Sequence, residues 1–167
     1  MSSTTNPGTS SKPQSPEAPS EVEISVVRTE SELPNGVQRP SLVRFFHETM
    51  KPYEDLPKDI DRALDYAFST EEGKGGFLVV GTRKDELVSA LLMLDTGMGG
   101  YVPSNLLLFV ATSPDLRGQG IGRKVCERAI AECDGPVKLH VEYDNPAKRL
   151  YERLGFTTKY AEMRLAR

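Results

Sequence analysis

The stretch PDLRGQGIGRKV, residues 114–125, combines small and basic residues at a spacing that could bind an anion. Three glycines alternate with other residues between two arginines: Gly118, Gly120 and Gly122, with Arg117 and Arg123. Glycines let the backbone approach a ligand because no Cβ stands in the way, and arginines form charge-assisted contacts. The residues that follow have helical periodicity, and the first amides of a helix lack an internal partner and lie at the positive end of its dipole. The stretch therefore predicts a phosphate site.

Two familiar nucleotide-binding patterns do not fit this turn. A P-loop would end in Gly-Lys-Ser/Thr, which is absent here. A dinucleotide-binding fingerprint would need a third glycine where the chain has Arg123, and it would lie near the start of a fold rather than in the last third of the chain. At this point a glycine-rich connection that binds no ligand remains an alternative.

The elements that must position the turn follow from hydrophobic periodicity. Strands are expected at 22–26, 76–82, 86–94, 105–112, 137–143 and 156–165. Helices are expected within 39–53 and 55–69 and at 120–133 and 145–155. The last helix carries a full set of end signals, with Asn145 as its cap, Pro146 as its first helical residue and Gly155 as its stop.

This order of elements predicts an α/β protein whose central sheet is mixed. The first strands can pair antiparallel, with a hairpin across 83–86, and the strand–helix–strand unit from 105 to 143 should be a parallel crossover. Residues 1–21 are rich in Ser, Thr and Pro and have almost nothing to bury, so we expect a disordered tail there. The folded domain is expected at 22–167.

The composition argues against several classes of protein. The chain has 167 residues, a net charge of −3 and a pI of about 5.5, which gives no electrostatic reason to expect a nucleic acid as the main partner. No apolar run reaches the roughly 18 residues of a membrane helix. Cys126 and Cys133 form no metal-ligand spacing with the two histidines and are expected to be small buried residues. We therefore predict a cytoplasmic protein that needs no metal.

Two motifs carry a resemblance to a known family. The turn fits the pattern Arg/Gln-x-x-Gly-x-Gly/Ala, and the segment before it, VATSPDL, is similar to an x-Val-x-Pro segment except that Thr112 stands where valine is usual. Downstream, NPAKRLYERLGF is similar to a second motif, whose marked positions are taken by Asn145, Tyr151, Gly155 and Phe156. Together these motifs resemble the GNAT superfamily of acyl-coenzyme A-dependent N-acetyltransferases, over roughly residues 22–165.

The resemblance implies a GNAT-like fold, in which helices flank a central mixed and splayed β-sheet. It also implies transfer of an acetyl group from acetyl-CoA to a primary amine by direct attack, through a tetrahedral intermediate with an oxyanion. The strand before the turn would hold the pantetheine arm, the turn would hold the pyrophosphate, and Lys148 would either meet the 3′-phosphate or be solvated. The implied coenzyme-binding residues are Val110, Ala111, Thr112, Arg117, Gly118, Gln119, Gly120, Ile121, Gly122, Arg123, Asn145 and Lys148.

The catalytic residues are also inferred from the resemblance. Tyr151 takes the position of the general acid that protonates the sulfur, although a tyrosine there could simply be part of the core. The strand 105–112 has no carboxylate, whereas many relatives carry a glutamate base on one of the two splayed strands. His140 is the preferred base, because a histidine accepts a proton near neutral pH, and Glu142 acting through water is the reserve. Some relatives use a water chain instead.

The acceptor stays open among an amino acid, a polyamine, an aminoglycoside-like amine and a protein N-terminus. In this fold the first two helices and their loop usually line the acceptor pocket, so His47, Glu54 and Asp55 are candidates for contact with a cationic amine or are plain surface residues. The rival functions are a non-catalytic acyl-CoA sensor or regulatory subunit, and an unrelated α/β phosphate-binding protein. A homodimer also stays open.

Overall fold

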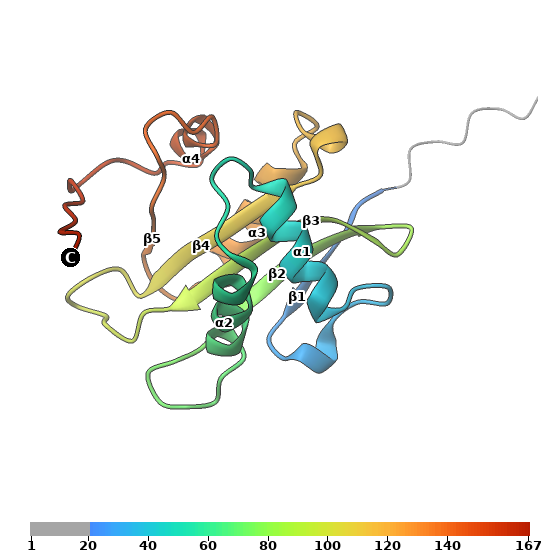
Figure 1. Cartoon of the computed structure of the whole chain (residues 1–167), viewed down its shortest axis with the longest axis horizontal. Coiled ribbons are helices and arrows are strands. Elements are labelled where there is room, and N and C mark those ends of the chain that lie inside the picture. Colours follow the sequence, from blue (N-terminus) through green and yellow to red (C-terminus); the bar gives the residue numbers. More distant parts are fainter. Residues whose placement is uncertain (1–20) are drawn as a thin grey trace, which may run out of the picture.

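A five-stranded sheet in the order β1-β2-β3-β4-β5 forms the centre of the protein (Figure 1). The structure is a computed structural model that describes residues 21–167, so the predicted tail lies, apart from Glu21, outside the described residues. The strands are β1 Glu23–Val27, β2 Gly76–Arg83, β3 Glu86–Asp95, β4 Asn105–Thr112 and β5 Val137–Leu139. The helices are α1 Arg39–Thr49, α2 Pro57–Ala67, α3 Ile121–Ala131 and α4 Lys148–Arg153, with 3-10 turns at Glu30–Glu32 and Pro114–Leu116.

The pairing of the strands confirms the predicted mixed sheet. The first four strands pair antiparallel in sequence order, and β4 pairs parallel with β5 across the α3 crossover. At the β2–β3 hairpin Lys84 and Asp85 have φ of 52° and 59°, as a tight two-residue turn requires. Both strands of this hairpin are almost continuously buried, since helices cover the two faces of the sheet.

Helices lie on both faces of the sheet (Figure 1). On one face α1 and α2 bury their apolar stripes, including Leu42, Phe46 and Ile60, in a core shared with β2, β3 and the end of β4. On the other face α3 and α4 pack with Val125 and Tyr151 among their buried residues. These apolar residues recur three or four positions apart, so one stripe of each helix faces the sheet.

Two predicted strands differ from the structure. The strand expected at 137–143 ends at Leu139, and the strand expected at 156–165 is absent. Phe156 packs partly buried beside Tyr151, whereas Tyr160, Met163 and Leu165 in the rest of that segment are exposed. Apolar alternation favours an extended chain but does not supply a neighbouring strand, and a strand needs one to satisfy its backbone groups.

The ends of α4 confirm Gly155 as the stop of the helix and correct its predicted start, because Ala147 and not Asn145 is the N-cap. The Asn145 side chain accepts a hydrogen bond from the Ala147 amide at 2.9 Å, but the helix begins only at Lys148. Pro146 lies in the preceding turn and is therefore not the first helical residue. At the other end the Phe156 amide donates to the Tyr151 carbonyl and the Gly155 amide to the Glu152 carbonyl, which is the Schellman arrangement that a terminal glycine predicts.

Candidate active site

The strands β4 and β5 separate shortly after they begin. Only three residue pairs join them, from Asn105 with Val137 to Leu107 with Leu139. The register between β3 and β4 shifts at the same point: Met93 pairs with Leu107 and Leu92 with Phe109, which leaves Leu108 as an extra residue. Such a β-bulge bends its strand, so β4 turns away from β5 where their pairing ends.

The bulge also changes which face of the sheet each β4 side chain meets. Leu107 lies in the core beneath α3, whereas Phe109 and Ala111, which would share its face in a regular strand, lie in the core beneath α1 and α2. Beyond Leu107, the edge of β4 that faces away from β3 has no strand partner among residues 21–167. Val110 to Thr112, predicted to pair with the pantetheine arm, lie along this open edge.

The glycine turn after β4 leaves a row of backbone donors free. Leu116 and Arg117 donate to the carbonyls of Ser113 and Pro114, and the next amide with a backbone acceptor is that of Lys124, which bonds to Gly120. Within the described chain the six amides from 118 to 123 donate no hydrogen bond. Buried or not, backbone amides are strong donors, so an uninterrupted row of them predicts an acceptor-rich ligand.

The glycines of this turn serve its shape and its access. Gly118 and Gly120 have φ of +76° and +80°, a left-handed conformation that glycine adopts at no steric cost, and a Cβ at either position would meet nothing within 4 Å. Gly122 serves close packing instead, because a Cβ there would lie 3.3 Å from Thr112 Oγ1. The turn is therefore open at Gly118 and Gly120, whereas at Gly122 the first turn of α3 packs closely against the end of β4.

The guanidinium groups of the two arginines in the turn form hydrogen bonds with other groups of the protein. Arg123 Nε donates to Glu127 at 2.7 Å, one helical turn along α3. Arg117 Nε donates to the Thr112 carbonyl at 3.2 Å, and its Nη2 donates to the Thr49 carbonyl, at the end of α1, at 2.7 Å. Each guanidinium thus has partners within the protein.

The side chains from the second motif lie on and around α4. Lys148 Nζ lies 5.9 Å from the centre of the Tyr143 ring and 3.9 Å from Glu152. Asn145 is occupied by the Ala147 amide. Leu150 would approach a Cβ at Gly122 to 3.9 Å, so α4 packs against the first turn of α3, directly beside the free amides.

Tyr151 is buried in the core beneath α3, with its ring edge-on to Phe156 at 6.0 Å between centroids. Its hydroxyl forms no hydrogen bond within residues 21–167. Burial raises the pKa of Tyr151 well above its ordinary value, because a phenolate would lose its hydration there, and the nearby Cys126 adds to this effect. The phenol is therefore protonated at neutral pH, as a proton donor must be.

The two candidate bases occupy the segment that continues from β5. His140 and Glu142 are exposed, in contrast to the buried Tyr151. The hydrogen bond with Arg164 is the main reason that the pKa of the Glu162 carboxyl is lowered. The nearby His140 contributes to the same shift. The structure thus places the predicted bases outside a strand and the predicted acid inside the core.

A contact that the sequence did not predict joins the α1–α2 loop to this same segment. The Tyr53 hydroxyl lies near the Asp144 carboxylate, and Glu142 is also close enough to act on it electrostatically. Desolvation, then the charge of Asp144, raises the pKa of Tyr53, so its hydroxyl stays protonated. No pattern in the sequence marks two residues 91 positions apart as partners.

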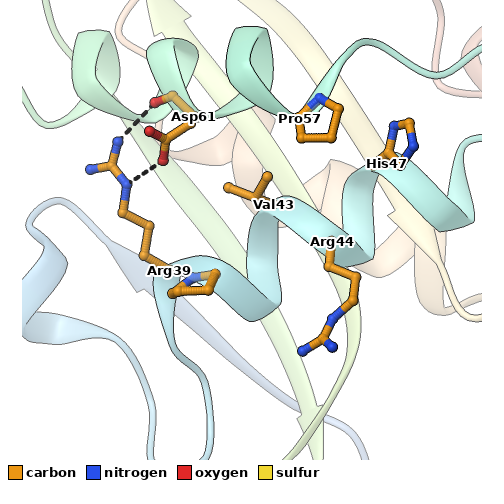
Figure 2. Close-up of a pocket in the computed structure, with 7 residues that line it drawn as sticks. Arg39, Val43, Arg44, His47, Pro57 and Asp61 are labelled. Atoms are coloured by element: carbon orange, nitrogen blue, oxygen red, sulfur yellow. Dashed lines mark hydrogen bonds and ion pairs between the residues drawn. The ribbon is translucent and has the colours of Figure 1, made fainter.

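A groove of about 370 Å³ lies between α1 and α2 (Figure 2). It is lined by Arg39, Pro40, Val43, Arg44, His47, Pro57 and Asp61. Arg39 bridges it by donating to Asp61 at 2.7 Å, and His47 Nδ1 donates to the Asp55 carbonyl at 2.9 Å. None of the lining residues belongs to the glycine turn or to β4, so the groove is separate from the free amides.

The described residues contain no cluster of three metal-ligating side chains, and Cys126 and Cys133 are both free. Burial raises the pKa of the Cys126 thiol to about 12 and that of Cys133 to about 11, so both are neutral. No helix within 21–167 combines the length and the apolar character needed to cross a bilayer.

The family model described as an acetyltransferase (GNAT) domain matches residues 73–158, just over half of the chain. This range runs from the start of the β2–β3 hairpin through the open edge of β4, the glycine turn and α4. The chain therefore belongs to the GNAT acetyltransferase family and is an acyltransferase. Members of this family use acetyl-CoA.

Solved structures with the same fold span almost the whole chain. The aminoglycoside N-acetyltransferase AAC(6')-Iy in complex with CoA has a TM-score of 0.64 at 9% identity, over 92% of this chain and 99% of that one. A transcriptional regulator from Bacillus halodurans C-125 has a TM-score of 0.62 at 23% identity, over 87% and 99%. The ribosomal-protein-S18-alanine N-acetyltransferase from Escherichia coli has a TM-score of 0.58 at 17% identity, over 83% and 80%.

These identities support the shared fold and no more. No curated protein matches the chain by sequence. The acceptor must therefore be argued from the site itself.

Proposed function

We propose that this protein transfers an acetyl group from acetyl-CoA to a primary amine and that its glycine turn holds the diphosphate of the coenzyme. The observation that carries this proposal is the uninterrupted row of free amides from 118 to 123 at the start of α3. The diphosphate supplies the acceptors that these amides lack, and the helix dipole and Arg123 favour its negative charge. The open edge of β4 at 110–112 offers main-chain groups for the amide-containing pantetheine arm.

Acetyl-CoA supplies the acyl group as a thioester, from which the amine nitrogen takes it while the carbon–sulfur bond breaks. The departing sulfur needs a proton, and the amine must lose one. Tyr151 is the proposed donor, because burial keeps its phenol protonated and α4 lies beside the turn. His140, or Glu142 through water, is the proposed acceptor of the amine proton, since both lie on the exposed continuation of β5.

A cationic amine fits the surroundings of this site best. The α1–α2 loop carries Glu54 and Asp55, and Tyr53 connects it to Asp144 beside Glu142. Four carboxylates thus lie on the two segments that flank the opening between β4 and the continuation of β5. Opposite charges attract an ammonium group and concentrate it near the site.

A pair of variants at Gly120 tests the coenzyme site. Gly120→Asp places a negative charge where the diphosphate should lie, whereas Gly120→Asn has the same size, tolerates a positive φ and is neutral. We expect titration calorimetry to find no CoA binding to Gly120→Asp and weakened but measurable binding to Gly120→Asn. Equal affinities for the two variants would contradict the site, and so would the absence of any heat when CoA is added to the folded parent protein.

Release of the CoA thiol in the presence of amines tests the reaction itself. We expect thiol release from acetyl-CoA to depend on a cationic amine such as a polyamine and to be slow with an anionic one. Binding of acetyl-CoA without amine-dependent thiol release across amino acids, polyamines, aminoglycosides and peptides would instead support a sensor that has lost turnover.

A further inference from the structure

The Arg117 side chain connects three parts of the molecule. Arg117 belongs to the glycine turn, and its guanidinium donates to the carbonyl of Thr112, the last residue of β4, and to the carbonyl of Thr49, the last residue of α1. The residues joined by the second contact are 68 positions apart in the sequence. The side chain thus bridges the proposed coenzyme site and the helix that leads into the α1–α2 loop.

The chemistry of this bridge suits an arginine in particular. Thr49 is in the last turn of α1, where the carbonyls have no donor within the helix and the dipole is negative, so a guanidinium there is favourable. Arginine donates from two different nitrogens held in a rigid plane, here Nε to one carbonyl and Nη2 to the other. A lysine has the same charge but only one nitrogen, so it cannot reproduce this geometry.

The α1–α2 loop is held on its far side as well. Tyr53 lies near Asp144 on the segment after β5, and His47 donates to the Asp55 carbonyl, which fastens the loop to its own helix. The loop therefore runs from Arg117 on the β4 side of the opening to Asp144 on the β5 side. In the proposed site, the position of this loop determines the surface that the acceptor amine contacts.

We infer that Arg117 is a positioning residue that transmits coenzyme binding to the α1–α2 loop. The inference rests on the proposed function, because it requires the amides of the turn and the edge of β4 to hold CoA. Arg117 lies between those two sets of coenzyme contacts, so bound CoA fixes its backbone and the Thr112 carbonyl together. The guanidinium then holds Thr49 in place, and the loop is ordered before the amine arrives. If bound CoA increases the affinity for the amine by a given factor, thermodynamic linkage requires the amine to increase the affinity for CoA by the same factor.

Hydrogen–deuterium exchange of the full chain with and without CoA tests this inference without an amine. In the parent we expect CoA to slow exchange both at 118–124 and at 49–55, the latter by about fivefold or more. In Arg117→Lys we expect slowing at 118–124 alone. Arg128→Lys is the matched control, because Arg128 lies on α3 outside the turn and pairs with Glu132 at 3.0 Å, and it should retain both effects.

The outcomes separate this inference from the proposed function. Slowing in the parent at 118–124 but not at 49–55 would overturn the inference and leave the coenzyme site intact. Retained slowing at 49–55 in Arg117→Lys would overturn it too, by showing that charge alone suffices. No slowing anywhere in the folded parent would overturn the proposed function, and the inference with it.

Discussion

Tyr151 combines a buried ring with a protonated hydroxyl, the state that its proposed role as proton donor requires. Its ring packs beneath α3 against Phe156, and its hydroxyl lacks a hydrogen-bond partner among the described residues. No side-chain polar atom among the described residues is both fully buried and without a partner, so this hydroxyl lies where solvent or a ligand can reach it. This is the arrangement that the proposed proton donor needs, because the hydroxyl is free to reach the sulfur of the substrate.

Replacement of Tyr151 by phenylalanine separates this role from packing. The ring and its contacts remain, and only the hydroxyl is lost, so we expect kcat to fall by about 10²-fold or more while the Kd of acetyl-CoA changes little. Steady-state thiol release and calorimetry measure the two quantities. Tyr101→Phe serves as the control, since Tyr101 is 90% exposed on the β3–β4 loop. Unchanged turnover in Tyr151→Phe would remove this residue from the mechanism.

Among the elements, the junction of β4 and α3 determines where the turn sits. The Thr112 hydroxyl shares a hydrogen bond with Ser89 at 2.9 Å, and Ser89 also donates to the Ala111 carbonyl at 2.9 Å. Thr112 is therefore held in place and cannot easily move away from α3. Gly122 is the residue that lets α3 approach this hydroxyl, which brings the free amides to the end of the strand.

Alanine at position 122 tests this junction in two backgrounds. In the parent, Gly122→Ala should destabilise the protein, because its Cβ would lie 3.3 Å from the fixed Thr112 Oγ1. In a Thr112→Ala background the same change should stabilise it by up to about 1 kcal/mol, because alanine is the better helix former. Urea denaturation of the four proteins gives the coupling between the two sites. Equal effects of Gly122→Ala in both backgrounds would show that the contact does not matter.

The β-bulge at Leu108 is the second feature at the scale of elements. It bends β4 away from β5 and moves Phe109 and Ala111 to the opposite face of the sheet from Leu107. The same extra residue thus opens the edge that would receive the pantetheine arm and divides β4 between two cores. A site for an extended ligand arises here because the strand loses one neighbour while it keeps the other.

At the scale of the whole molecule, the core beneath α3 protects groups that ionise in alkali. Cys126 and Tyr151 share the core beneath α3, and burial raises both of their pKa values, that of Cys126 from 9.0 to about 12. The unfolded chain releases the Cys126 proton near pH 9, whereas the folded chain retains it. Stability from this thiol is thus complete below pH 9 and is lost as the pH rises toward 12.

The free energy of unfolding should therefore fall in alkaline solution. Each buried group contributes a slope of about 1.4 kcal/mol per pH unit over the range in which only the unfolded chain has lost its proton. Urea denaturation under reducing conditions between pH 8 and pH 11 measures the slope. Cys126→Ala should show a smaller slope than the parent, while Cys133, whose pKa is about 11, continues to contribute. A free energy that stays constant up to pH 11 would contradict the burial of these groups.

The sequence by itself determined the local structure and the family. Periodicity located the helices, the hairpin and β4, because the faces that α-helices and strands bury repeat at 3.6 and 2 residues. The glycines at 118, 120 and 155 marked turns that only a few residue types allow, and the two motifs around them identified an acetyltransferase. These features depend on neighbours along the chain, so they can be read from it directly.

The tertiary structure alone decided which segments meet. The bulge at Leu108 has no residue signature, and nothing local shows that 140–143 and 156–165 lack a strand to pair with. The sequence marked Arg117 as a coenzyme-binding residue, and only the fold shows that its guanidinium donates to Thr49 and Thr112. Pairing and long-range hydrogen bonds require a partner brought from a distant part of the chain, and local residue patterns contain no information on where that partner lies.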